Sequence, residues 1–470
     1  MIFVGLIVAY GTLFLAGAGI TLLLSARARE LNLVEWFCLS WLFGVGAISL
    51  LLWICGAIVS GILLQVSVTA LSVLLAYSGW RAFRRAGARL FLPRPRTRAE
   101  WILTALLAVQ IAVIVCASCK RTLGWDGLLV WEIKARYAFL NDGVLPAAYF
   151  QGSGRAFSHP DYPLALPFTQ LWIYLWMGEA NQFWAKTIFM VFYAAGAALV
   201  ALFSARLTGC RWIGLLAGVL FCFVPQAAVG IGSALVGYAD FPLSIFYVAA
   251  IGYLLCASIG ERPHAFWLYA ACLTFLPWIK REGVILWVIA ALLGVVLIFV
   301  QRRSKAWLLA LLPGLCVIAG WQGFLRTINA THSLDFTPVS LEILRANLSR
   351  LGPIGHALLS EMTSVSRWGI FWLLAGIASL YMLRRWRDLR SWLLLAAVLS
   401  PIALYCLTYI FSAWPQYADH VESSLARLLM HVVPVAWLCI SAAVSSSAAR
   451  VTEKTCQPSL SAQTPMVDLA

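Results

Sequence analysis

Three carboxylates lie in one polar segment between apolar runs and are candidates for catalytic groups. Asp126 follows Trp125, Glu132 comes later in the same stretch, and Asp161 lies close behind His159. A carboxylate that is held near a reacting group can accept a proton from it. The same segment also carries Lys134 and Tyr162, which could bind a polar or anionic substrate.

Each of these residues also has an ordinary structural interpretation. An aspartate before an apolar helix, such as Asp126, is often only an N-cap. Glu132 and Arg136 are spaced to form an i, i+4 pair on a solvated helix face. Asp161 could simply start a helix through the proline that follows it, and a single loop histidine such as His159 is more often structural than catalytic. These alternatives stay open from the sequence alone.

Further charged residues stand where later apolar runs end. Ionisable residues at membrane depth are costly and are therefore functional candidates. A lysine or arginine at such a position can also just reach for the lipid headgroups. The residues concerned are Asp240, Lys280, Arg281, Glu282 and Arg427.

The elements that must position these residues are membrane-spanning helices. The chain is 62% hydrophobic and only 11% charged, whereas a soluble domain is about 45–50% apolar and about 25% charged. Apolar runs long enough to span a bilayer recur from end to end. The sequence therefore predicts an all-α, polytopic bundle of transmembrane helices.

The distribution of basic residues predicts the orientation of the bundle. Residues 81–98 contain seven arginines and no acid, so the positive-inside rule assigns this loop to the cytoplasm. Alternation from there predicts thirteen spans with an outside N-terminus. The predicted inside loops then hold 21 of the 34 basic residues and only 7 of the 19 acids. The net charge of +15 is thus a topological signal, and no nucleic-acid partner is expected.

This topology divides the chain into six segments. The outer loops are the first candidates for function, and two juxtamembrane helices are expected in the first of them, over residues 125–136 and 164–176. The segments are N-terminal spans with the basic loop (1–118), a catalytic outer loop (119–182), core spans (183–325), a second outer loop (326–367), C-terminal spans (368–447) and a disordered cytoplasmic tail (448–470).

Cysteine usage gives no clear metal site. Most cysteines lie inside apolar runs, where a thiol behaves as a small hydrophobe. Cys116 and Cys119 form one C-x-x-C at the outer end of a span, but no second cysteine pair or histidine cluster accompanies it. We therefore expect no cofactor and predict no metal ligands, while a divalent metal stays open.

Five short motifs occur in order between the predicted spans. They are Trp125-Asp126 with Trp131 and Lys134, His159-Pro160-Asp161-Tyr162-Pro163-Leu164, Tyr238-Ala239-Asp240, Lys280-x-Glu282-Gly283, and Ser424-x-x-Arg427 near Pro434. Their order and side of the membrane resemble the GT-C class of membrane glycosyltransferases, which includes protein O-mannosyltransferases and bacterial transferases of lipid-linked sugars. The resemblance covers residues 101–300 and, more weakly, the C-terminal part.

The resemblance implies an inverting transfer from a polyprenyl-phosphate-linked sugar to an acceptor hydroxyl. Asp126 would be the base, with Asp161 and Glu132 as further catalytic candidates, and the cations would stabilise the leaving phosphate. The adjacent paired acids of the protein mannosyltransferases are absent, because Gly127 follows Asp126. This departure argues against a protein acceptor, although a glycan, lipid or protein all remain candidates.

Membrane lipids are expected partners, and the expected location is a bacterial inner membrane with the active site on its outer side. Two other functions compete with the transferase. A transporter or flippase for lipid-linked saccharides would place ionisable residues and broken helices near the bilayer midplane. A polymerase or ligase of such saccharides would also have large outer loops.

Overall fold

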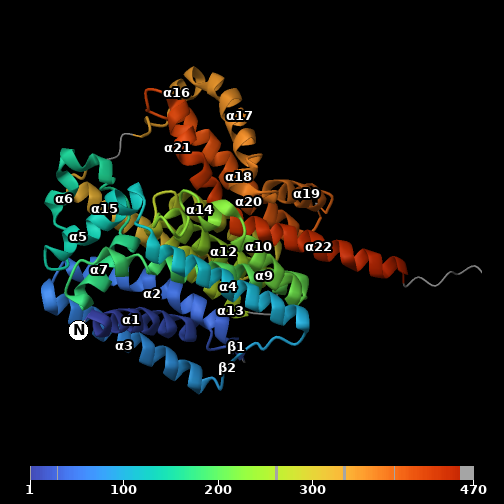
Figure 1. Cartoon of the computed structure of the whole chain (residues 1–470), viewed down its shortest axis with the longest axis horizontal. Helices are drawn as coiled ribbons and strands as arrows, with labels where there is room; N and C mark the ends of the chain where they lie inside the picture. Colours follow the sequence, from blue (N-terminus) through green and yellow to red (C-terminus); the bar gives the residue numbers. More distant parts are fainter. Residues whose placement is uncertain (1, 29, 260–262, 332–334, 386, 456–470) are drawn as a thin grey trace, which may run out of the picture.

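In a computed structural model, the chain folds into a bundle of α-helices (Figure 1). The structure describes residues 2–28, 30–259, 263–331, 335–385 and 387–455, and only the backbone of residues 263 and 445–455. Among the described residues, nine helical segments are long and apolar enough to cross a membrane. They comprise α1 (Ile2–Leu24), α2 (Leu33–Gly56), α3 (Gly61–Arg85), α4 (Arg98–Lys120), α8 (Gln182–Ala185) with α9 (Ile188–Thr208), α12 (Asp240–Ser258), α14 (Gly283–Val300), η3 (Lys305–Leu311) with α15 (Leu312–Thr327), and α20 (Leu389–Thr408) with η5 (Tyr409–Phe411).

The remaining predicted spans correspond to shorter or bent helices. A tenth candidate is the pair α21 (Tyr417–Met430) and α22 (Val433–Thr455), which is bent by 50°. Three more predicted spans contain α10 (Arg211–Cys222), α13 (Pro263–Ile279) and α19 (Phe371–Leu383). The predicted all-α membrane bundle is confirmed, while the count of thirteen spans stays a prediction. α22 also continues beyond the predicted boundary at residue 447, and residues 456–470 of the predicted tail lie outside the described residues.

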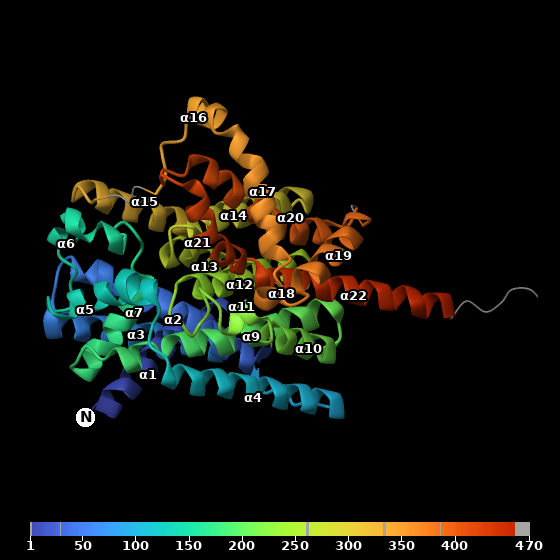
Figure 2. The ribbon, with the colours of Figure 1, turned by 45° about the horizontal axis from the view of Figure 1, so that its top comes forward.

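The connections on the side of the first outer loop are mostly short helices. A π-helical turn, η1 (Gly127–Glu132), runs directly into α5 (Ile133–Phe139). The second outer loop projects from the bundle at the top of Figures 1 and 2. The other short helices are α6 (Ala147–Gln151), η2 (Ser153–Ser158), α7 (Ala165–Met177), α11 (Pro225–Ala228), α16 (Leu341–Ala346), η4 (Leu348–Arg350), α17 (Leu351–Met362) and α18 (Val365–Trp368).

A small parallel sheet was not predicted from the sequence. β1 (Glu30–Asn32) pairs with β2 (Arg89–Phe91), with Leu31 opposite Leu90. β1 follows α1, and β2 lies in the basic loop after α3. The pairing therefore ties the predicted cytoplasmic ends of the first three long helices together.

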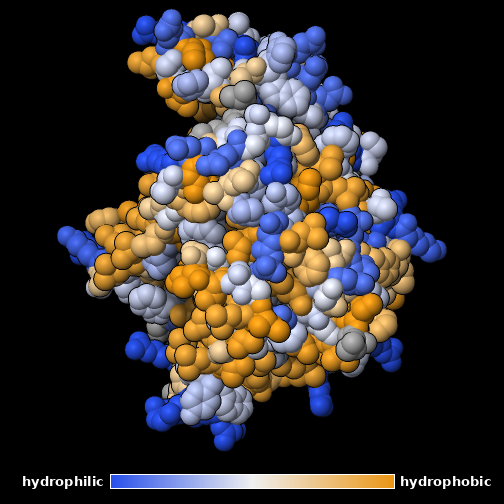
Figure 3. Space-filling model, turned by 90° about the vertical axis from the view of Figure 1, so that its left-hand side faces the viewer, coloured by the Kyte–Doolittle hydropathy of each residue, from blue (hydrophilic) through white to orange (hydrophobic). Residues whose placement is uncertain are grey.

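Burial separates the central helices from those that face outward. In α12, 94% of the apolar stretch is buried, compared with 17% in α3 and α4. Figure 2 shows α4 along one edge of the bundle, beside α9 and α10. Broad hydrophobic areas cover the middle and lower parts of the face seen in Figure 3. Exposed apolar area on this scale needs lipid around it, so α12 is the core of the bundle and α3 and α4 form part of its lipid boundary.

The two predicted juxtamembrane helices exist, but they do not lie open at the surface. α7 packs against α1, α2 and α5, and every residue of Ala165–Tyr174 is buried. Its aromatic residues therefore belong to the protein core, where Trp172 donates a hydrogen bond of 2.8 Å to Thr12. Sequence amphipathicity identified the helix, but not the neighbours that cover it.

Glycines allow α1 to approach α2 and α3 with the backbones in contact. A Cβ atom added at Gly17 would collide with the backbone of Ser40 and Gly44, and one at Gly19 with the backbone of Leu75. Small residues at such crossings are a general device of membrane helix packing. The same helix also carries Gly11, where an added Cβ would meet nothing within 4 Å.

We expect Gly17→Leu to destabilise the protein strongly, because the side chain cannot fit without separating α1 from α2. Overpacking in a close contact costs about 1–3 kcal/mol. Gly11→Leu is the matched control, since it changes the same helix at an open position and should leave stability nearly unchanged. Size-exclusion chromatography first shows that the purified variants are monodisperse, and thermal unfolding then measures the difference in their stability. Equal melting temperatures for the two variants would contradict this packing.

Candidate active site

A cavity of about 920 Å³ opens at the ends of several helices, on the side of the first outer loop. Its lining comes from the start of η1, the loop before α7, the start of α12, the α13–α14 turn, residues 335–339, the C-terminal end of α20 with η5, and α21. Nine of the eleven predicted site residues line this cavity or a smaller neighbouring one. Eight line the larger cavity: Asp126, His159, Tyr162, Asp240, Lys280, Arg281, Glu282 and Arg427. Asp161 lines only the smaller cavity, and Glu132 and Lys134 line neither.

The floor of the cavity is built around the buried carboxylate of Asp240, the first residue of α12. Its Oδ1 atom lies 2.8 Å from Nζ of Lys280 and 3.0 Å from Nε2 of His431, and its Oδ2 atom lies 3.3 Å from Nε of Arg427. The side chain has no exposed surface. The N-terminal dipole of α12 also favours a negative charge at this position. Asp240 therefore holds together three side chains from two other parts of the chain, the α13–α14 turn and the end of α21.

Lys280 and Glu282 lie in the turn between α13 and α14. Nζ of Lys280 is 2.9 Å from Oε1 of Glu282, so the ammonium group bridges two carboxylates. Burial alone would lower the pKa of Lys280, but Asp240 and Glu282 outweigh it and raise that pKa. Burial would raise the pKa of Glu282, but the charge of Lys280 outweighs it and lowers that pKa. Both groups are thus kept ionised.

Arg427 connects this floor to the first outer loop. Its Nη2 atom lies 2.7 Å from Oδ2 of Asp126, and its guanidinium carbon lies 4.9 Å from the ring centre of Tyr238. Asp126 makes no side-chain capping bond to the helical turn that follows it. Its carboxylate faces the cavity and pairs with Arg427, so the N-cap interpretation is wrong.

Two residues of the floor were missed from the sequence. His431 bridges Asp240 and the hydroxyl of Tyr405, which lies 2.9 Å from its Nδ1 atom. His431 follows Arg427 by four positions, so the two side chains share one helical face. A histidine in an otherwise apolar terminal span, one turn after an arginine, was the available signal.

Lys134 and Glu132 do not line the cavity, and both side chains make contacts with other parts of the protein. Nζ of Lys134 donates a hydrogen bond of 2.7 Å to the carbonyl of His159 and lies over the ring of Trp131. Glu132 accepts a hydrogen bond of 2.7 Å from Tyr174 and pairs with Arg136 at 3.1 Å. The predicted i, i+4 pair therefore forms, but Glu132 is buried and does not lie on a solvated face.

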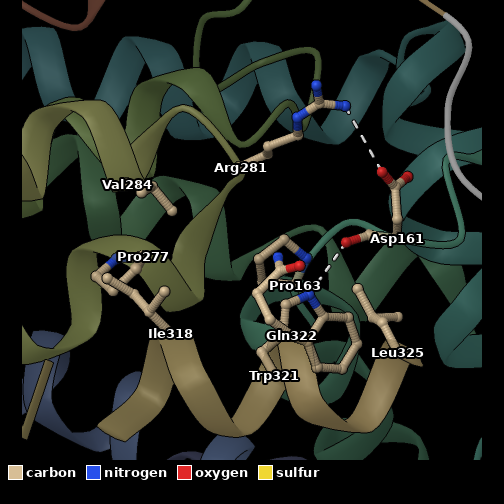
Figure 4. Close-up of a pocket in the computed structure, with 9 residues that line it drawn as sticks. All are labelled: Asp161, Pro163, Pro277, Arg281, Val284, Ile318, Trp321, Gln322 and Leu325. Carbon is tan, nitrogen blue, oxygen red and sulfur yellow. Dashed lines mark hydrogen bonds and ion pairs between the residues drawn. The ribbon is translucent and has the colours of Figure 1, made fainter. Parts of the chain in front are cut away.

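A smaller cavity of about 320 Å³ adjoins the first (Figure 4). Arg281 points toward Asp161 across its upper part, with Nη1 to Oδ2 at 3.6 Å, and Trp321 donates a hydrogen bond of 3.0 Å to the carbonyl of Asp161. Ile318 and Leu325 add apolar surface from α15. Arg281 also lines the larger cavity, so it stands at the boundary between the two cavities.

His159 and Tyr162 form part of the outer wall. Their rings stack at 4.7 Å, and the backbone of His159 is left-handed, with φ of 45°. Burial lowers the pKa of His159, against the opposing effect of Asp335, so the ring is mainly neutral near pH 7. Burial also raises the pKa of the Tyr162 hydroxyl.

The site brings together carboxylate, ammonium, guanidinium and imidazole groups, which can take part in acid–base and electrostatic chemistry. Within the described residues, no three histidine, cysteine or acidic side chains are grouped so as to hold a metal ion. Comparison with known proteins gives no identification, since no family model, curated protein or solved structure matches the chain.

The buried Lys134 makes a testable contribution to the pH dependence of stability. Burial lowers its pKa to about 7, against the opposing charge of Asp161, whereas an unfolded lysine has a pKa of about 10.4. Between these values the unfolded chain binds the additional proton, so stability should rise with pH. We expect the melting temperature of the wild type, relative to that of Lys134→Met, to increase from pH 7 to pH 9.5. If the difference in melting temperature between the wild type and Lys134→Met stayed constant over this range, the lowered pKa of Lys134 would be contradicted.

Proposed function

We propose that the protein is a membrane glycosyltransferase. It would transfer a sugar from a polyprenyl-phosphate-linked donor to an acceptor hydroxyl on the non-cytoplasmic face. The observation that carries this proposal is the pairing of Asp126 with Arg427 in a cavity of about 920 Å³ at the helix ends. A carboxylate and a guanidinium side by side provide one group for the acceptor proton and one for the leaving phosphate.

The reaction would be a single displacement. The acceptor oxygen attacks the anomeric carbon and gives its proton to Asp126, while the bond from that carbon to the phosphate oxygen breaks. The electron pair leaves with the phosphate, which cations stabilise better than a general acid does. Attack opposite to the leaving group inverts the anomeric centre. Asp126 can accept a proton freely only when Arg427 releases it, and a bound phosphate offers Arg427 another anionic partner.

The charges of the floor favour Arg281 as the first cation that the donor phosphate contacts. Three carboxylates, of Asp126, Asp240 and Glu282, are set against the two cations Lys280 and Arg427, so the floor alone does not attract an anion. The side chain of Arg281 is 41% exposed, whereas that of Lys280 is 2% exposed. Arg281 also borders the smaller cavity, where Val284, Ile318 and Leu325 offer aliphatic surface for part of an isoprenoid chain.

The position of the charges favours a transferase over a transporter. Asp240 begins α12, Glu282 directly precedes α14, and Asp126 lies outside the long helices. Transporters generally place such groups near the midplane, at broken helices. A transporter or flippase would move the lipid-linked saccharide without breaking its glycosyl–phosphate bond, and a polymerase would join saccharide to saccharide.

An assay in proteoliposomes tests the proposal and the base together. A polyprenyl-phosphate donor with a radiolabelled sugar is added with a membrane extract as acceptor source, and free polyprenyl phosphate is measured. We expect Asp126→Asn to lower its formation by about 10²–10⁴-fold, because the change removes the base while it keeps the size of the side chain. The change also removes the ion pair with Arg427, so the protein yield is compared with that of the wild type. Asp142→Asn is the control, since Asp142 is an exposed aspartate of the same outer loop. Movement of intact donor without release of polyprenyl phosphate would establish transport instead.

Replacement of Arg281 tests the cation that meets the donor. We expect Arg281→Gln to raise KM for the donor with normal protein yield, because the side chain is partly exposed and pairs with Asp161 only at 3.6 Å. Arg326→Gln controls for general attraction of anions, since Arg326 is exposed at the end of α15. Lys280→Gln should instead lower the yield, because it leaves the buried Asp240 and the partly buried Glu282 without their shared cation. An unchanged KM in Arg281→Gln would exclude this role for Arg281.

A further inference from the structure

The outer wall of the large cavity contains two stacked pairs of rings joined by one carboxylate. The ring of Trp414 stacks on His420 at 4.8 Å and an interplanar angle of 13°, and His159 stacks on Tyr162. Asp335 lies between the pairs, with Oδ1 at 3.1 Å from Nε1 of Trp414 and Oδ2 at 3.5 Å from Nδ1 of His159. All five side chains line the cavity.

The backbone holds this aromatic wall in a fixed geometry. Residues 335–337 run antiparallel to residues 411–413, with Phe336 opposite Ser412. The amide of Ala413 donates a hydrogen bond of 2.9 Å to the carbonyl of Asp335, and the amide of Thr337 donates one of 2.8 Å to that of Phe411. Asp335 lies within this backbone pairing and Trp414 directly follows it, so the pairing positions both residues.

The wall is accessible, in contrast to the floor. Trp414 is 37% exposed, and one of its faces is covered by His420. The side chains of Asp335 and His159 are 23% and 26% exposed, whereas that of Asp240 is fully buried. A ligand that enters the cavity thus meets aromatic faces and one carboxylate before it reaches the ionic floor.

We infer that this wall binds the acceptor, and that the acceptor is a saccharide. A pyranose ring has an apolar face of C–H groups, which packs on an aromatic ring, and hydroxyl groups at its edge. Trp414 supplies a large flat apolar surface that is polar at one end. The carboxylate of Asp335 beside it can accept charge-assisted hydrogen bonds from two hydroxyls. This inference rests on the proposed function, and it narrows the acceptor to one chemical class.

The same features fit the other acceptor classes less well. A peptide acceptor is usually held by backbone hydrogen bonds along an open strand edge or in a groove with side-chain pockets. Here residues 335–337 and 411–413 already pair with each other. The chain of a lipid acceptor needs continuous apolar walls, whereas this wall carries Asp335, His159 and His420.

Binding can be tested without the transfer reaction. Saturation-transfer difference NMR would be recorded on the full chain in nanodiscs with the methyl glycosides of glucose, galactose, mannose and N-acetylglucosamine. We expect saturation of the ring protons of at least one glycoside, and none for a threonine-containing tripeptide. Trp414→Ala should weaken the binding about tenfold, while Trp414→Phe should retain most of it.

Two further variants keep the result interpretable. Trp392→Ala removes an exposed tryptophan from the opposite end of α20 and should bind like the wild type. Asp335→Asn keeps the shape of the wall and should also weaken binding, which provides a second measurement if Trp414→Ala does not fold. Three results would overturn the inference. They are saturation of the tripeptide but of no glycoside, no saturation of any ligand, and equal saturation of the glycosides by the wild type and all variants. Glycoside binding without any transferase activity would refute the proposed function and leave the saccharide site standing.

Discussion

The arrangement of the site depends on the neutralisation of one buried carboxylate. An ionised aspartate without water is very costly unless several charged or polar partners compensate it. Asp240 obtains these partners from the α13–α14 turn through Lys280 and from the C-terminal helices through Arg427 and His431. Because Arg427 also pairs with Asp126, the same carboxylate indirectly positions the first outer loop. Helices that are far apart in sequence are thus joined at one point.

This requirement divides the cavity into parts with different properties. The floor must be preorganised, since each of its charges compensates another and a displaced side chain would leave a buried group unpaired. Such fixed charges are suited to stabilising a transition state, because little reorganisation is needed during the reaction. The wall of Trp414, Asp335 and His159 is more exposed and is held by backbone pairing. Recognition of a neutral ligand is better suited to this part of the cavity.

The sequence predicted the bundle well because apolar length is a local property. Each predicted span contains a helix, and the charged residues at the ends of α12, α13 and α21 were identified as candidates. Long-range contacts have no comparable local signal. The parallel pairing of β1 with β2 joins residues on either side of a helical hairpin, and the hydrogen bond from His431 to Asp240 spans 191 positions. Neither contact leaves a periodic pattern in the chain.

The first outer loop shows why residue type alone could not separate catalytic from structural candidates. Asp126, Glu132 and Lys134 lie within nine positions and were assigned to the site together. A helix, however, turns successive residues to different sides. Asp126 faces the cavity and Arg427, whereas Glu132 faces Tyr174 of α7 and Lys134 reaches the carbonyl of His159. The π-helical turn at Gly127–Glu132 shifts these directions further from those of a regular helix. Which face lies toward the cavity is decided by the packing of α7, and the sequence of the loop does not contain that information.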